Sequence, residues 1–408
     1  MIISTQCRSA KQLAALLPII IWASSAILNA DDSTNATTAA SASLLTWPDG
    51  QALPTFASPA PTLDAIDVQT LTVDERIMFS ALQGIVNARQ PRIYLMDSRA
   101  EEGPDTWAKT TTIDFTSRNR FTRDTKYELI SKYIDETNGI VLYDPTRSDH
   151  YRNLATTVAG LKRALPVTPD LLASLRQTGL QFNVVADLTT LQHSTAVDIY
   201  QHLYDTYWSQ CDKRLLTSIK PDRRRGNHHQ IRDMATACGA AVVWLDCRMP
   251  AERELMRKFL ADMQAGKAII LGWYTSERSG ITTASEFGIG TIPADHYNSS
   301  TMFAGTDHRI AIPPVPKKPP LENNIYVAVF ISDGDNIQYV QRAMRRIWDR
   351  VAESRGRVPL NWTIAPGLVD IGPGILNYYY QNATARDCFV AGPSGMGYLM
   401  PINTLAEL

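Results

Sequence analysis

The stretch IYVAVFISDGDN, residues 325–336, decides the fold expected for the C-terminal region of the chain. Its residues 325–331 are apolar and mostly β-branched or aromatic, which predicts a strand buried on both faces of a parallel sheet. Asp333 and Asp335 follow that strand directly. In parallel α/β folds, ligands and catalytic groups gather at the carboxyl ends of strands, because the loops leading into the helices open there. The sequence therefore places a candidate site at these two aspartates.

The sequence after this stretch repeats one unit of strand and helix. Residues 337–351 carry apolar side chains at helical spacing, and strand and helix patterns then alternate over residues 360–391. The strands begin about every thirty residues, a spacing typical of (β/α) barrels and doubly wound sheets. Loops after three neighbouring strands are then expected side by side, at 332–336, 366–370 and 392–398. The arginines expected on a solvent-exposed face of the first helix are Arg342, Arg345, Arg346 and Arg350.

Helix and strand patterns also alternate through residues 63–311, which predicts parallel α/β subdomains. The clearest helix spans 71–87, where Thr72 and Glu75 form a capping box before an apolar face. No element is assigned to the stretch at 274–305, which is rich in Gly, Ser and Thr. The expected domains are a signal peptide (1–26), a flexible leader (27–62), N-terminal α/β subdomains (63–210), a further α/β subdomain (211–311), an extended Pro-rich linker (312–320) and an incomplete (β/α)-barrel-like C-terminal domain (321–408).

The N-terminus has the residue order of a secretory signal peptide. Arg8 and Lys11 precede an apolar run at 13–23 and small residues at 24–26, so cleavage after Ala26 is expected. The alternative is a signal anchor that stays in the membrane, although the run is short for a span. A secreted protein, extracellular or periplasmic, is therefore expected, with no stable membrane span after cleavage.

The charge of the chain argues against a nucleic-acid partner. A net charge of -1 creates no field that attracts nucleic acid or anionic lipid. The one dense basic run, at 223–225, is read as a solvated loop. We expect no nucleic acid among the partners.

The cysteines and histidines form no recognisable metal or redox motif. Cys238 and Cys247 flank a strand-like segment, and either a disulfide between them or two free thiols fits the sequence. No two histidines have the i, i+4 spacing of a metal pair, and the adjacent His228 and His229 are expected to be exposed. We expect no metal and no cofactor.

A second loop, GPSGMGYLMP at residues 392–401, adds glycines to the expected site. Glycines let backbone amides approach a ligand closely, but this loop lacks the GK[ST] ending of a phosphate-binding loop. Asp335 and Asn336 are also ordinary helix N-cap residues, so a structural capping role remains an alternative to chemistry.

The segment GMGYLMP, residues 395–401, resembles the signature of the GxGYxYP family of glycoside hydrolases, with Met400 where the family has its second tyrosine. The resemblance extends in order over nearly the whole chain from about residue 64. The other segments that carry it are LQGIVNARQPRIYL, YDPTRSDHYRNLATTVAGLKRAL, GWYTSERSGITTASEFGIGTIPADHYNSSTMFAG, ISDGDNIQY and WTIAPGLVDIGPGILNYYY. It implies small N-terminal α/β subdomains, a barrel-like catalytic domain and a carbohydrate substrate. Because such a barrel takes about 200 residues, the domain after the linker is expected to be truncated.

The resemblance also implies roles for particular residues. Glycoside hydrolysis usually needs two carboxyl groups about 5–9.5 Å apart, one of them able to hold a proton near neutral pH. Asp333 and Asp335 are the expected catalytic residues, more as one partner and a helper than as two opposed partners. Tyr398 is expected to stack on a sugar ring, whereas Trp362, inside a strand, is expected in the core. The expected substrate-binding residues are Asn336, Ser394, Gly395, Gly397, Tyr398, Glu286, Glu277 and Asp295.

Three functions fit these residues. The first is a secreted glycoside hydrolase that acts on a poly- or oligosaccharide by carboxylate acid/base chemistry, in a truncated copy. The second is a non-catalytic secreted glycan-binding protein, which the truncation favours. The third is a metal-dependent carbohydrate deacetylase, whose usual histidines are missing from the C-terminal domain because all seven precede the linker.

Overall fold

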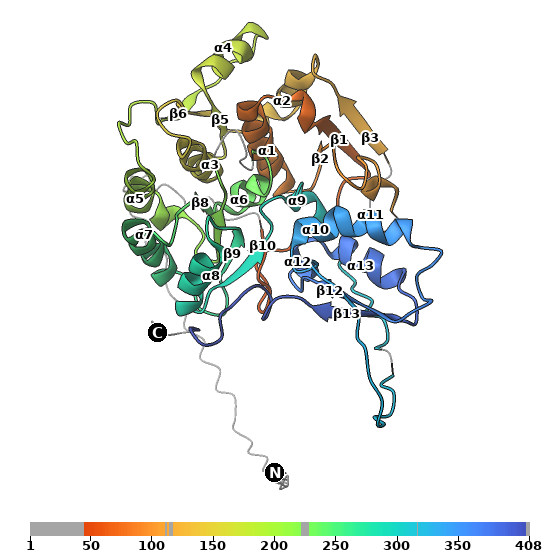
Figure 1. The fold of residues 1–408 in the computed structure, drawn as a ribbon. Coiled ribbons are helices and arrows are strands. Elements are labelled where there is room, and N and C mark those ends of the chain that lie inside the picture. Colours follow the sequence, from red (N-terminus) through yellow and green to blue (C-terminus); the bar gives the residue numbers. More distant parts are fainter. Residues whose placement is uncertain (1–44, 111, 114–116, 222–227, 316, 405–408) are drawn as a thin grey trace, which may run out of the picture. The chain divides into compact units, whose positions relative to one another are not determined.

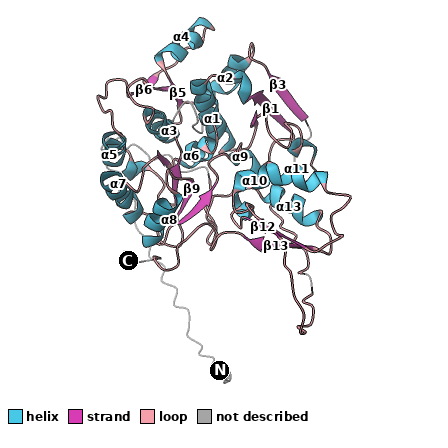
Figure 2. Cartoon of the chain, viewed as in Figure 1, coloured by secondary structure: helices cyan, strands magenta, loops and turns pink. Residues whose placement is uncertain are grey.

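The structure, a computed structural model, describes residues 45–110, 112–113, 117–221, 228–315 and 317–404. The expected signal peptide, the first part of the expected leader and the basic run at 223–225 lie outside these residues. Strands and helices alternate along the described chain (Figure 1, Figure 2). Within it, no helix combines the length and the apolar character that crossing a membrane requires.

Three of the sheets share one topology, in which the first strand in sequence lies between the second and the third. Their orders are β2-β1-β3, β5-β4-β6 and β10-β9-β7-β8, and all of their strand pairs are parallel. Doubly wound sheets of this kind bind ligands where the winding reverses, at the carboxyl ends of the strands. The α/β fold class is confirmed. The strands are β1 (Thr62–Asp67), β2 (Ile93–Met96), β3 (Ser117–Phe121), β4 (Ile140–Leu142), β5 (Leu165–Val167), β6 (Val184–Asp187), β7 (Leu215–Ser218), β8 (Ala241–Val243), β9 (Ile269–Gly272) and β10 (Gly290–Pro293).

The fourth sheet has its three parallel strands in sequential order, β11 (Phe330–Ile331), β12 (Leu360–Ile364) and β13 (Asp387–Ala391). Sequential order is also that of a (β/α) barrel, but three strands leave a sheet open. The expectation of a buried strand over 325–331 is wrong. Ile325 is 94% exposed, Val327 is 83% exposed, and β11 pairs on one side only. The apolar residues of this run favour burial. Their sequence does not show whether another element packs against them.

Helices connect the strands and surround them (Figure 2). The expected capping box is confirmed: Thr72 Oγ1 accepts from the Glu75 amide at 3.3 Å, and Glu75 Oε2 accepts from the Thr72 amide at 2.9 Å. The helices are α1 (Val73–Asn87), α2 (Lys126–Tyr133), α3 (Tyr151–Lys162), α4 (Pro169–Gln177), α5 (Ala196–Thr206), α6 (Arg232–Cys238), α7 (Pro250–Ala261), α8 (Glu277–Glu286), α9 (Ser300–Phe303), α10 (Ile337–Gln341), α11 (Ala343–Arg350), α12 (Leu368–Ile371) and α13 (Pro373–Gln381).

The stretch at 274–305, to which the sequence assigned no element, contains α8, β10 and α9. Gly280 lies inside α8, where glycine is intrinsically unfavourable. A Cβ at Gly280 would lie 2.1 Å from Cγ of Tyr274, so the helix packs directly on that ring. The glycine therefore serves close packing rather than breaking the helix.

Two of the hydrophobic cores cross the boundaries of the expected subdomains. Helices α1 and α6 approach so closely that a Cβ at Gly84 would lie 2.3 Å from the backbone oxygen of Asp233. The buried Asp233 carboxylate in turn accepts from Ser300 Oγ at 2.7 Å and from the Thr301 amide at 2.8 Å. Helix α1, which follows β1, thus packs on α6, and Asp233 of α6 holds the start of α9.

Residues 45–61 pack onto the rest of the described chain, so the expectation of a flexible leader over 27–62 is wrong for them. Leu53 and Phe56 are 0% and 1% exposed in the largest core. Asp370 Oδ2 accepts from the amides of Ala52 at 2.7 Å and Leu53 at 3.3 Å. A few large apolar residues without a regular period are enough to anchor this segment.

The expected solvated face of arginines is wrong in part. The helix pattern over 337–351 is broken at Arg342, whose φ of −114° and ψ of −86° separate α10 from α11. Arg342 Nη1 lies 3.4 Å from Asp97 Oδ2, and the guanidinium carbon of Arg345 lies 3.6 Å from the Tyr378 ring centroid. Arg345 is only 7% exposed.

The structure also decides the state of the cysteines and the location of Trp362. Cys211, Cys238, Cys247 and Cys388 are free thiols, so Cys238 and Cys247 do not form the disulfide considered for them. Trp362 lies in the core as expected, 1% exposed, with its ring centroid 4.9 Å from that of Trp348.

The carboxyl group of Glu102 predicts a pH-dependent stability. Burial raises the pKa of Glu102 from 4.5 to about 7, and no described residue hydrogen-bonds to its Oε2. Folding therefore takes up a proton between these values, and the stabilisation is complete below about pH 4.5 and is lost as the pH rises through about 7. We expect Glu102→Gln to raise the free energy of unfolding by about 1–3 kcal/mol at pH 8 and to change it little at pH 4. Denaturant unfolding at both pH values checks this, with Glu101→Gln as the exposed control.

Candidate functional site

β12 holds the loop that carries Asp333 in a strained conformation. Asp333 has a φ of 71°, in the left-handed region that residues other than glycine rarely adopt. Thr363 Oγ1 donates to the Ile331 carbonyl at 3.0 Å and accepts from the Gly334 amide at 2.9 Å. A Cβ at Gly334 would lie 1.6 Å from the Thr363 carbonyl oxygen. Such strain is concentrated at functional sites, which makes this loop a candidate for one.

Asp335 lies in a network of side-chain hydrogen bonds. The Tyr398 hydroxyl donates to Asp335 Oδ2, and Asn336 Nδ2 donates to the same oxygen at 3.3 Å. Asn336 occupies the N-cap position of α10, but its side chain makes no capping hydrogen bond. Its Oδ1 instead accepts from Gln338 Nε2 at 3.5 Å. The Asn336 side chain therefore hydrogen-bonds to Asp335 and Gln338 and does not cap α10.

The loop at 392–401 docks on the third sheet. Tyr398 pairs with Thr291 of β10 as an isolated antiparallel bridge, with N–H···O distances of 2.7 and 3.0 Å. The Met400 amide donates to Ser285 Oγ at 2.8 Å. A Cβ at Gly397 would lie 2.4 Å from the Thr291 carbonyl oxygen, so glycine permits this approach. The loop thereby places Tyr398 between β10 and Asp335.

Asp295 adds a half-buried carboxyl group just after β10. Its side chain is 20% exposed, and burial raises its pKa above the ordinary value. Asp295 Oδ1 accepts from Gln338 Nε2 at 3.1 Å, and His296 Nε2 lies 3.4 Å from Asp295 Oδ2. Because Gln338 also contacts Asn336, one amide group links Asp295 to the network around Asp335.

The phenol of Tyr398 lies at the centre of these groups. Burial raises the pKa of Tyr398, and the negative charges of Asp335, Glu277 and Asp333 raise it further. The hydroxyl therefore remains protonated near neutral pH and donates a hydrogen bond. The Trp273 ring, which follows β9, lies edge-on to Tyr398 with centroids 5.8 Å apart. The cluster thus combines four carboxyl groups, a donor and two aromatic rings.

Four family models match the chain, over residues 62–128, 137–211, 213–305 and 323–407. The first three are described as the first, second and third domains of GxGYxYP proteins, and the last as the "GxGYxYP putative glycoside hydrolase C-terminal domain". The chain belongs to the GxGYxYP family. Each of the four matched domains contains one of the four sheets.

A solved structure supports the fold of this GxGYxYP protein. It is a crystal structure at 1.25 Å resolution of a "putative hydrolase" from Bacteroides thetaiotaomicron, with a TM-score of 0.74 and 24% sequence identity. The match covers 88% of this chain and 69% of that chain. A search of curated proteins found no match.

The structure brings most of the predicted site residues of the GxGYxYP chain together. The members that converge are Asp333, Asp335, Asn336, Tyr398, Glu277 and Asp295. They come from the loops after β9, β10 and β11 and from the loop at 392–401, here called the signature loop. Two sheets therefore contribute to the site. Glu277 begins α8 and acts on Tyr398 through its charge.

The remaining predicted residues have structural contacts instead. Glu286 is 8% exposed and forms ion pairs with Arg253 at 2.7 Å and Arg257 at 2.5 Å. Ser394 Oγ donates to the Leu399 carbonyl at 2.8 Å, which braces the signature loop. Gly395 is exposed, and Gly397 serves the close approach to β10.

Three residues of the cluster were not singled out from the sequence: Trp273, Gln338 and Thr363. Trp273 directly follows β9 and Thr363 lies near the end of β12, and a strand end is the signal that would have found both. Gln338 lies inside α10 and had no such signal. The expectation that His229 is exposed is wrong. His229 is 3% exposed, and neither of its ring nitrogens has a hydrogen-bond partner among the described residues.

No three His, Cys, Asp or Glu side chains in the described ranges are placed to hold a metal ion together.

Proposed function

We propose that the chain is a secreted glycoside hydrolase whose active site is the cluster around Asp335, Asp295 and Tyr398. The observation that carries this proposal is the contrast between two carboxyl groups linked through Gln338. Asp335 Oδ2 accepts hydrogen bonds from Tyr398 and Asn336, whereas Asp295 lies in a more buried setting that raises its pKa. Two carboxyl groups in opposite environments are the arrangement that divides the acid and base roles of glycoside hydrolysis.

In this proposal, Asp295 is the general acid. It protonates the glycosidic oxygen as the bond to the anomeric carbon breaks. Asp335 acts from the other side of the bond as the carboxylate, either as nucleophile or as the base that activates water. Tyr398 and Asn336 fix the orientation of that carboxylate. Turnover then falls as the pH rises through the raised pKa of Asp295, because the acid loses its proton.

Other members of the cluster would bind the sugar. Asp333 and Glu277 are exposed and lie close enough to Tyr398 for their charges to act on it. Carboxylates of this kind accept hydrogen bonds from sugar hydroxyls. Trp273 and Tyr398 offer aromatic rings for the apolar face of a sugar. The family description supports carbohydrate as the substrate class, and the basic and apolar N-terminal residues support secretion.

The test is a screen of the purified chain against poly- and oligosaccharides that measures new reducing ends and released acetate. We expect new reducing ends from at least one glycan, with rates unchanged by a chelator. Acetate release that a chelator abolishes would support a metal-dependent deacetylase instead. Glycan binding without any product would support a non-catalytic binding protein and overturn the proposal.

A further inference from the structure

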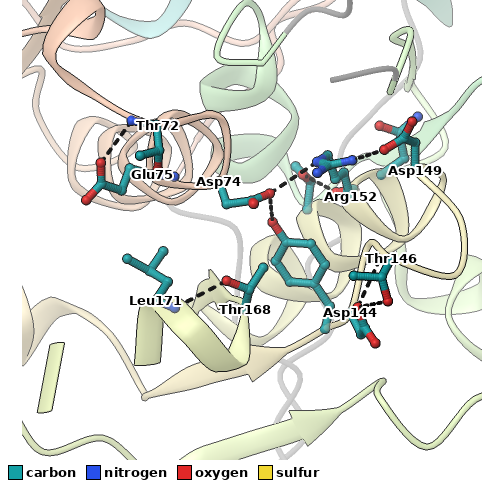
Figure 3. A network of polar contacts seen from close by, with 12 residues as sticks. Thr72, Asp74, Glu75, Asp144, Thr146, Asp149, Arg152, Thr168 and Leu171 are labelled. Atoms are coloured by element: carbon teal, nitrogen blue, oxygen red, sulfur yellow. Dashed lines mark hydrogen bonds and ion pairs between the residues drawn. The ribbon is translucent and has the colours of Figure 1, made fainter. Parts of the chain in front are cut away.

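A polar cavity lies at the carboxyl ends of β4 and β5, against the first turn of α1. Its volume is about 360 Å³, within the range of about 300–1,000 Å³ that is typical of small-molecule sites. Asp144 lines it after β4, Thr168 and Asp170 line it after β5, and Asp74 and Arg152 line it from α1 and α3. Figure 3 shows Asp74, Asp144, Arg152 and Thr168 on separate segments of the chain. The carboxyl edge of a parallel sheet is where α/β folds bind ligands.

Arg152 is a buried cation with one nitrogen left for a ligand. It is 2% exposed, its Nε donates to Asp74 Oδ1 at 3.1 Å, and its Nη1 pairs with Asp149 (Figure 3). Among the described residues, Nη2 donates to no partner, and it is not one of the buried polar atoms that lack both a partner and contact with solvent. Since Arg152 lines the cavity, Nη2 is available there as a hydrogen-bond donor.

The carboxylates that line the cavity offer free acceptor oxygens. Asp144 Oδ1 accepts from the amide and hydroxyl of Thr146 at 2.9 and 2.7 Å, and these bonds lower the pKa of Asp144. Asp74 Oδ1 accepts from the Tyr143 hydroxyl at 3.0 Å and from Arg152. In the described part of the chain, the second oxygens of Asp74 and Asp144 accept no hydrogen bond, and Asp170 is exposed at the start of α4. Acceptors therefore outnumber donors.

The excess of hydrogen-bond acceptors over donors in the lining indicates which class of ligand the cavity favours. Three carboxylates face one guanidinium that is already paired, so an anionic ligand is repelled and a ligand rich in N–H or O–H donors is favoured. A sugar supplies several hydroxyl donors on one small frame, and Pro145 and Pro169 in the lining offer apolar rings to its C–H face. We propose that this cavity is a second saccharide-binding site, separate from the candidate active site, which binds an amino sugar more tightly than its neutral counterpart and excludes an acidic one.

The test compares three sugars that share one ring: D-glucosamine, D-glucose and D-glucuronate. Calorimetric titration of the purified chain at pH 6 keeps the carboxylates and the ammonium charged. We expect D-glucosamine to bind with a Kd of about 1 mM, D-glucose about fivefold more weakly, and D-glucuronate not measurably. Equal binding of D-glucuronate and D-glucosamine, or no binding of any of the three at about 20 mM, overturns the proposal.

The chain offers a matched control for the variants. Asp187 ends β6 and accepts from the amide and hydroxyl of Thr189 at 2.9 and 2.6 Å, the same turn that Asp144 makes, but it does not line the cavity. Asp144→Asn and Asp170→Asn should each weaken D-glucosamine binding by about fivefold or more, and Asp187→Asn should leave it unchanged. Equal weakening by Asp187→Asn would show that binding is elsewhere. Glycan turnover, if present, should survive Asp144→Asn, so this proposal and the proposed hydrolase activity fail separately.

Discussion

Asp335→Asn is expected to lower kcat/KM on any glycan that the chain hydrolyses by about a thousandfold or more. The substitution keeps the shape of the side chain but removes the negative charge that the proposed chemistry needs. Nucleophilic or general-base carboxylates contribute effects of about this size, because no neighbouring group replaces them. The measurement is the initial rate of reducing-end release at the pH optimum, with melting temperatures compared to exclude unfolding.

Two further variants sharpen that result. Asp187→Asn makes the same chemical change at an exposed strand end outside the cluster and should leave turnover unchanged. Tyr398→Phe removes the hydroxyl that donates to Asp335 Oδ2, so the carboxylate loses one of the two hydrogen bonds that orient it. We expect it to lower turnover by about tenfold. Turnover at the wild-type rate in Asp335→Asn would remove this carboxylate from the mechanism.

Local signals in the sequence predicted the elements that depend on local chemistry. The capping box at Thr72 and Glu75 fixes where α1 begins, and the apolar periodicity of that helix matches its buried face. The position of Asp333 and Asp335 after a strand was enough to place them at the edge of a parallel sheet. The loop at 392–398 was likewise expected beside them, and Tyr398 does contact Asp335.

Features that depend on distant partners could not be predicted in the same way. Glu286 was predicted to be a site residue because its local sequence does not show that Arg253 and Arg257 of α7 form ion pairs with it. Residues 45–61 were predicted to be part of a flexible leader because their apolar residues do not recur at helix or strand spacing. Tertiary contacts nevertheless bury Leu53 and Phe56. The apolar residues before Asp333 predicted burial, but nothing in the described chain lies on the outer side of β11 to provide it.

The topology explains how two small sheets make one site. The sheet of β7 to β10 and the sheet of β11 to β13 each present their carboxyl ends to the cluster, and the signature loop joins them through Thr291 and Tyr398. Asp295 comes from one sheet, and Asp335 comes from the other. The acid and base of the proposed mechanism therefore meet only when the third and fourth domains are docked.

Gly334→Ala is expected to abolish most turnover although it leaves every side chain of the cluster chemically unchanged. The new Cβ would lie 1.6 Å from the carbonyl oxygen of Thr363, which belongs to β12, so the loop and not the strand has to move. That movement breaks the Gly334 amide bond to Thr363 Oγ1 and shifts Asp333 and Asp335 together. We expect a loss of about 3 kcal/mol or more in the free energy of unfolding and at least about a hundredfold loss of turnover.

Gly290→Ala is the matched control for this prediction. Gly290 lies at the start of β10, and a Cβ there would meet only Leu399 and the Tyr398 carbonyl, each at 4.0 Å. This substitution should change melting temperature and turnover little, because its Cβ has room. If Gly334→Ala behaves like Gly290→Ala in both measurements, then the strained loop at Asp333 is not required for the site, and catalysis does not depend on the position that Thr363 imposes on it.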